Sequence, residues 1–84
     1  MNTYLVLIRR TKHFTGRNLP AHRDFLTSLR ESGTLVSAGA FTDQTGGAYI
    51  LQCSSYKEAE AIVRRDPMND PNEAIYEVKE WNAH

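Results

Sequence analysis

Two side chains in this sequence are suited to acid–base chemistry, namely His22 and Asp66. Imidazole exchanges protons near neutral pH, and a carboxylate that binds one ring nitrogen leaves the other nitrogen free to act as a general base. This pair of residue types predicts removal of a proton from a small substrate. The prediction requires a fold that brings together two residues far apart in the chain.

Each candidate also has a plainer explanation. A histidine near the start of a helix is often only a packing or surface residue, and an aspartate before proline often ends a helix as a turn residue. His13 is a further candidate acid or base, and Ser54 and Pro67 are candidate substrate contacts. His13 could equally be an ordinary loop residue and Ser54 a helix cap. The residue types alone leave both interpretations open.

Composition argues against several functional classes. Ten Lys and Arg residues balance ten Asp and Glu residues, so no basic field gathers phosphates and we expect no nucleic-acid partner. His, Asp and Glu are too scattered for a metal triad, and no nucleotide-binding fingerprint occurs, so we expect no metal and no cofactor. The single Cys53 fits a reducing cytoplasm. The apolar run at residues 4–8 is far shorter than the roughly 20 residues of a membrane span, so we expect no membrane association.

Hydrophobic patterning predicts one domain over residues 1–84 with six elements. The segment 4–9 is apolar on both alternating faces, which is typical of a central strand covered on both sides. The predicted elements, in chain order, are a strand at 4–9, a helix at 19–32, strands at 34–40 and 48–53, a helix from 55 to near 66, and a strand at 74–81.

Local signals set the boundaries of these elements. Asn18 can cap the first helix, whose first turn contains Pro20, and Gly33 can end it in a left-handed conformation. Ser55 and Glu58 match a capping box at the start of the second helix. The paired glycines at 46–47 permit positive φ and predict a hairpin turn between the second and third strands.

The order of elements predicts an α+β sandwich of the ferredoxin-like βαββαβ type, with two helices on one face of an antiparallel four-stranded sheet. Successive elements alternate in direction along the sheet. This alternation places the first loop, the start of the first helix and the end of the second helix at the same end, or rim, of the domain. His22 and Asp66 therefore fall at the same rim. The other sheet face is bare, and covering it with a second copy predicts a homodimer.

The chain resembles the YCII-like family across nearly its whole length. The resemblance rests on the order and spacing of five motifs: residues 20–26 around His22, the GTLVSAG run at 33–39, the glycine pair that opens a strand, Glu58-Ala59, and Asp66 followed by proline. It implies a fold of the dimeric α/β-barrel group and a His and Asp dyad as the active site. The family includes a dehydrochlorinase that acts on a chlorinated hydroxyquinol-type ring.

Three positions depart from the family pattern. Relatives often carry arginine where this chain has Leu19, an aromatic residue where it has Met68, and proline where it has Ala40. Arg17 could replace the missing arginine and hold a developing oxyanion from the loop, although it could equally be a solvated loop cation. These departures mean that substrate identity should not be transferred from relatives.

Two functions follow as alternatives. In the first, the chain is a cofactor-independent enzyme whose His22 and Asp66 abstract a proton from a small hydroxylated cyclic or aromatic compound, with elimination or isomerisation as the outcome. In the second, it is a homodimeric module that binds a small ligand, or serves as an accessory subunit, without catalysis.

Overall fold

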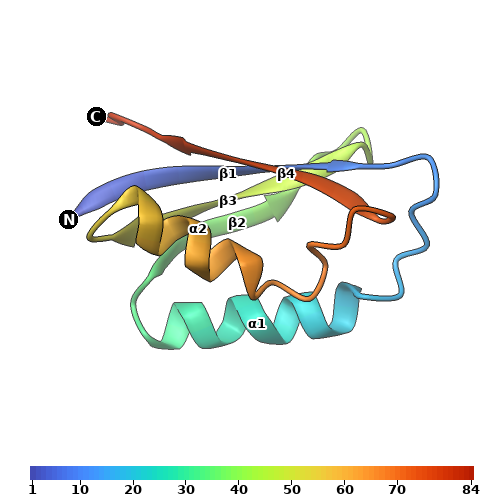
Figure 1. The fold of residues 1–84 in the computed structure, drawn as a ribbon, viewed down its shortest axis with the longest axis horizontal. Coiled ribbons are helices and arrows are strands. Elements are labelled where there is room, and N and C mark those ends of the chain that lie inside the picture. Colours follow the sequence, from blue (N-terminus) through green and yellow to red (C-terminus); the bar gives the residue numbers. More distant parts are fainter.

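The computed structural model describes residues 1–84 and contains the six predicted elements in the predicted order (Figure 1). Their bounds differ from the predicted ones by two residues or fewer at each end. The elements are β1 (Asn2–Arg10), α1 (Leu19–Glu31), β2 (Leu35–Ala40), β3 (Gly46–Cys53), α2 (Tyr56–Arg64) and β4 (Ala74–Glu80).

All four strands belong to one antiparallel sheet with the order β2-β3-β1-β4. Both helices cover the same face of this sheet, and the opposite face carries no element of the chain (Figure 1). The protein therefore has the α+β ferredoxin-like fold that the order of elements predicts. β1 lies between β3 and β4, so the predicted central position of the first strand is confirmed.

The core lies between the sheet and the helices. Along β1 the side chains of Tyr4, Val6 and Ile8 are buried under the helices, whereas Leu5 and Leu7 on the alternate face are half-buried. Within a single chain β1 is thus covered on one side only. The predicted cover on both sides would require a second molecule on the bare face.

Backbone conformation, and not a side-chain cap, marks both ends of the first helix. Asn18 occupies the N-cap position, but its side chain makes no capping hydrogen bond, contrary to the prediction. Pro20, the second helical residue, has no N–H to offer to that side chain. At the other end Gly33 has φ of +82°, which confirms it as the predicted left-handed stop.

The turn between β2 and β3 differs from the prediction. The predicted hairpin is present, and Gly46 has a positive φ of +158°. The left-handed residue of the turn is Gln44, however, with φ of +66°, and the paired glycines open β3. They are needed for close approach, because a Cβ at Gly46 would collide with the carbonyl oxygen of Ile8 on β1. A Cβ at Gly47 would lie 2.5 Å from the carbonyl oxygen of Gly39 on β2.

We expect Gly47→Ala to lower the free energy of unfolding by about 1–3 kcal/mol, because the added methyl group pushes the β2 backbone away from β3. Gly39→Ala is the matched control, since its Cβ would meet no atom within 4 Å. Urea unfolding followed by circular dichroism measures both variants. Equal stability of the two would contradict the close approach of β2 and β3.

A buried glutamate holds the loop between β1 and α1. The carboxylate of Glu73 accepts hydrogen bonds from the backbone N–H and hydroxyl of Thr15, at 3.0 to 3.1 Å, and from the N–H of Gly16 at 3.2 Å. Burial would raise the pKa of Glu73, but these bonds outweigh it and hold that pKa below its ordinary value. The loop is therefore tied to the segment before β4.

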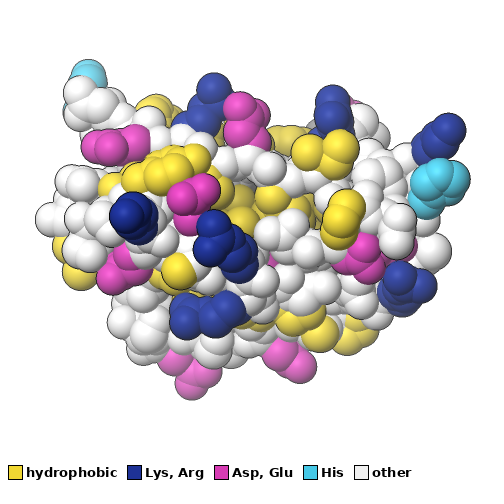
Figure 2. Space-filling view, viewed as in Figure 1, with side chains coloured by type: hydrophobic (Ala, Val, Ile, Leu, Met, Phe, Trp, Pro, Cys, Tyr) yellow, Lys and Arg dark blue, Asp and Glu magenta, His cyan; other side chains and the backbone are white.

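The surface shows no strong charge asymmetry in the view of Figure 2. Lys and Arg side chains are interspersed with Asp and Glu over the helices and the sheet edge, in keeping with the balanced composition. No helix is long and apolar enough to cross a membrane.

Candidate active site

His22 and Asp66 meet in the structure. Nδ1 of His22 lies 2.8 Å from Oδ1 and 3.0 Å from Oδ2 of Asp66. His22 is 8% exposed and Asp66 is 3% exposed, so the pair lies under the surface between the helices and the sheet. His22 comes from the first turn of α1 and Asp66 from the turn that follows α2. The predicted convergence at one rim is therefore present as a direct hydrogen bond.

Asp66 accepts three further hydrogen bonds. The hydroxyls of Tyr49 and Tyr76 donate to Oδ2 at 3.0 Å and 2.8 Å, and the backbone N–H of Met68 donates to Oδ1 at 3.0 Å. Burial, and then the charge of Asp66, raise the pKa of both tyrosines far above the ordinary value. Both phenols stay neutral and continue to donate. The carboxylate is thus fixed by donors from β3, β4, α1 and its own turn.

This arrangement sets the role of each ring nitrogen of His22. A carboxylate only accepts hydrogen bonds, so Nδ1 of the neutral ring carries the hydrogen and Nε2 keeps its lone pair. Nε2 has no hydrogen-bond partner in the protein, yet it is not sealed from solvent. It is therefore the available basic atom of the pair.

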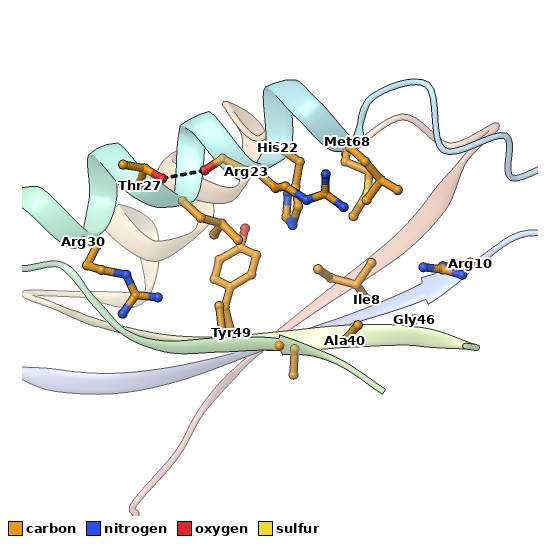
Figure 3. A pocket seen from close by; sticks show the side chains of 16 residues that line it. Ile8, Arg10, His22, Arg23, Thr27, Arg30, Ala40, Gly46, Tyr49 and Met68 are labelled. Carbon is orange, nitrogen blue, oxygen red and sulfur yellow. Dashed lines mark hydrogen bonds between the residues drawn. The ribbon is translucent and has the colours of Figure 1, made fainter. Parts of the chain in front are cut away.

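His22 lines a cavity of about 400 Å³ between α1 and the β2–β3 side of the sheet (Figure 3). Tyr49 stands at the back of this cavity, with its ring centroid 6.2 Å from that of His22. The lining residues are Ile8, Arg10, Leu19, His22, Arg23, Leu26, Thr27, Arg30, Ala38, Gly39, Ala40, Gly46, Gly47, Ala48, Tyr49 and Met68. The volume suits a small ring compound.

Four other residues proposed from the sequence lie away from the cavity lining. Arg17 is exposed and forms an ion pair with Asp70 at 3.4 Å, so it does not replace the missing family arginine at this cavity. His13 and Pro67 are exposed. The N–H and hydroxyl of Ser54 both donate to Glu58 at 3.1 Å, at the start of α2. Their sequence positions suggested the site, but their side chains serve the loop, the turn and the helix cap.

Sequence reasoning missed the three arginines that line the cavity and the two tyrosines that hold Asp66. Arg23 and Arg30 could have been found from helical spacing, because they share a face of α1 with the cavity-lining Leu19 and Leu26. Tyr49 and Tyr76 lie on strands, where an aromatic residue is typical of packing. Nothing in strand alternation indicates that their hydroxyls reach a carboxylate.

The site contains no alternative nucleophile or metal centre among these side chains. No three His, Cys, Asp or Glu side chains are placed to hold a metal ion. Cys53 is buried in the core, and burial raises the pKa of its thiol. Nε2 of His22 is the basic atom that the site presents to the cavity.

Comparisons with known proteins agree with the fold. A family model described as the YCII-related domain matches residues 3–82. The uncharacterized protein YjpA of Bacillus subtilis (strain 168) is 37% identical over 81 residues, which are 96% of this chain and 95% of YjpA. A solved structure of 5-chloro-2-hydroxyhydroquinone dehydrochlorinase from Burkholderia phenoliruptrix AC1100, in complex with 2,5-dihydroxybenzoquinone, superposes with a TM-score of 0.79. It covers 98% of this chain and 95% of its own at 18% identity.

Proposed function

The chain belongs to the YCII-related family, and from this premise we propose that it is a cofactor-independent enzyme that abstracts a proton from a small hydroxylated ring compound. The observation that carries the proposal is the buried pair of His22 and Asp66, with Nε2 of His22 open to a cavity of about 400 Å³. A base that is oriented on one side and open on the other is what proton abstraction requires.

In the proposed reaction Nε2 of His22 accepts a proton from a hydroxyl or carbon of the ring. The electron pair of the broken bond stays on the substrate and is delocalised onto a ring oxygen. Loss of a leaving group such as chloride, or return of the proton at another ring atom, completes an elimination or an isomerisation. Asp66 stabilises the imidazolium that forms, and its tyrosine donors keep the carboxylate in place.

The solved dehydrochlorinase supports the class of substrate. That protein has the same fold, its name describes removal of HCl from a chlorinated hydroxyhydroquinone, and its complex contains a dihydroxybenzoquinone. The cavity of the present chain has a volume that suits such a ring and is half lined by apolar side chains. We propose a hydroxylated six-membered ring as the substrate class for this chain.

Turnover by the parent protein tests this proposal. Chlorinated hydroxyhydroquinones are followed by chloride release, and unchlorinated ring compounds by exchange of ring hydrogens with deuterium in heavy water, using proton NMR. We expect release or exchange faster than without protein. Binding of these compounds with neither reaction would overturn the enzyme proposal and favour a non-catalytic ligand-binding module.

We also propose that two copies pair through the bare sheet face. Leu5, Leu7 and Ile75 project from this face, and Leu7 and Ile75 line a hollow together with Phe41. Ile75 is 49% exposed and Phe41 is 41% exposed. A second molecule over these apolar side chains would complete the cover of β1.

We expect the parent to be a dimer at micromolar concentration and Ile75→Lys to be monomeric, because the variant would bury an unpaired charge in the interface. Ala61→Lys is the control, since it adds the same charge on the exposed side of α2. Sedimentation equilibrium gives the mass of each protein. A monomeric parent would rule out the dimer.

A further inference from the structure

The cavity beside His22 is lined by three cations and no anion. Arg10 enters from the end of β1, and Arg23 and Arg30 enter from α1. None of the other lining residues is an Asp or Glu. Asp66 lies behind His22 and is already held by four donor groups. The cavity lining therefore carries an excess of positive charge, although the net charge of the whole chain is zero.

No carboxylate of the protein neutralises these three guanidinium groups. Arg10 donates to the backbone oxygen of Gln44 at 3.1 Å and lies over the ring of Phe14, 4.4 Å from its centroid. The side chains of Arg23 and Arg30 have no ion pair and no hydrogen bond in the structure. By contrast, Arg17 outside the cavity is paired with Asp70. All three guanidinium groups that line the cavity are therefore free of carboxylate partners and available to an anionic ligand.

The arginines on α1 point into the cavity because of helical spacing. Arg23, Thr27 and Arg30 are related by four and three residues, which places them on one helix face, and Arg30 lies two turns beyond Arg23. In Figure 3 the guanidinium group of Arg30 extends from α1 toward the sheet, that of Arg23 runs along α1 and lies beside His22, and that of Arg10 lies at the opposite end from Arg30. Tyr49 and His22 lie between these two ends.

Part of the opposite wall, beside Ile8 and Tyr49, has no large side chains. Small residues of β2 and β3 form it, namely Ala38, Gly39, Ala40, Gly46, Gly47 and Ala48. Strand pairing forbids a larger side chain at the two glycines that open β3. This part of the wall leaves room for the face of a planar ring beside Tyr49, and the arginines of the facing helix line the same cavity.

From this geometry we infer that the natural ligand is a planar ring that carries a carboxylate, with the carboxylate bound by Arg23 or Arg30 and a ring hydroxyl directed to His22. A guanidinium group binds a carboxylate through two parallel hydrogen bonds. The cation also stabilises the negative charge that develops when His22 removes a proton. This inference deepens the proposed function, on which it depends for the role of the cavity as ligand site.

Two probes that differ by one carboxylate test the inference. We expect 2,5-dihydroxybenzoate to bind the parent about 10- to 100-fold more tightly than 1,4-hydroquinone, as measured by calorimetry or by NMR titration. The double variant Arg23→Gln with Arg30→Gln should lose this preference. Arg65→Gln, which removes an exposed arginine outside the cavity, should keep it. Circular dichroism checks that each variant is folded.

Equal affinity of the two probes for the parent, or no binding of 2,5-dihydroxybenzoate at millimolar concentration, would overturn the inference. So would a preference for the carboxylate that survives loss of both arginines. The His22→Gln variant separates this inference from the proposed function, because it should keep the preference while losing catalysis. A parent that prefers the carboxylate but never transfers a proton would leave the anion site standing and remove the enzyme proposal.

Discussion

Replacement of His22 by glutamine is expected to lower turnover by about 10²- to 10⁴-fold, the usual contribution of a positioned general base. The glutamine amide can still donate a hydrogen bond toward Asp66, but it has no basic nitrogen to direct into the cavity. The loss should therefore appear in kcat, and the affinity for a ring compound should change little. Rates of chloride release or of hydrogen exchange, measured at saturating substrate, give this comparison.

His13→Gln is the matched control for this substitution. His13 is exposed on the loop between β1 and α1 and does not line the cavity, so its replacement should leave turnover at the parent rate. If His22→Gln also retained the parent rate, His22 would not be the base. An equal loss in both variants would point to a general effect on the fold.

Asp66→Ala should produce the largest loss of stability, about 3–5 kcal/mol in the free energy of unfolding. The substitution removes the acceptor for the hydroxyls of Tyr49 and Tyr76, the N–H of Met68 and Nδ1 of His22, all in the protein interior. Each buried donor left without a partner is costly. Urea unfolding followed by circular dichroism measures the effect, and Asp24→Ala on the exposed face of α1 is the control.

Asp66→Asn separates stability from catalysis. The amide oxygen can still accept from Met68 and His22, and the two tyrosine hydroxyls can rotate to accept from the amide NH₂ group. We therefore expect a loss of stability below about 1.5 kcal/mol together with a large fall in turnover, because a neutral amide does not stabilise an imidazolium. A stability loss for Asp66→Ala no greater than that for Asp24→Ala would contradict the structural role of the carboxylate.

Much of the fold could be predicted from local patterns. The alternation of Tyr4, Val6 and Ile8, the Ser55 cap that starts α2 and the stop at Gly33 are all short-range features, and the structure contains each of them. The other half of the capping box differs, because the Glu58 carboxylate accepts from Ser54 rather than from the N–H of Ser55. The order of the elements then limits the topology to a few choices, since βαββαβ connections follow consistent rules of handedness. That order was sufficient to place His22 and Asp66 at the same rim.

Two predicted local features, the Asn18 cap and the turn at the paired glycines, differ from the structure because of neighbouring residues. Asn18 makes no side-chain cap: its backbone is helical, with φ of −94° and ψ of 0°, and Pro20 has no N–H to donate. The paired glycines open β3 instead of forming the turn, and their lack of a Cβ permits the close approach of β1 and β2. The contacts of the glycine pair with β1 and β2 join residues far apart in the chain, which no short window of sequence describes.

The sequence by itself determined the family, the six elements and the end of the molecule at which His22 and Asp66 lie, because period, caps and turn residues act within a few positions of the chain. Only the tertiary structure decided which groups complete the site. Tyr49, Tyr76 and Arg10 come from three different strands, and Arg23 and Arg30 from the helix above them. The partners of a side chain depend on how the strands and helices pack against one another. No local sequence pattern gives the distances between side chains on different elements.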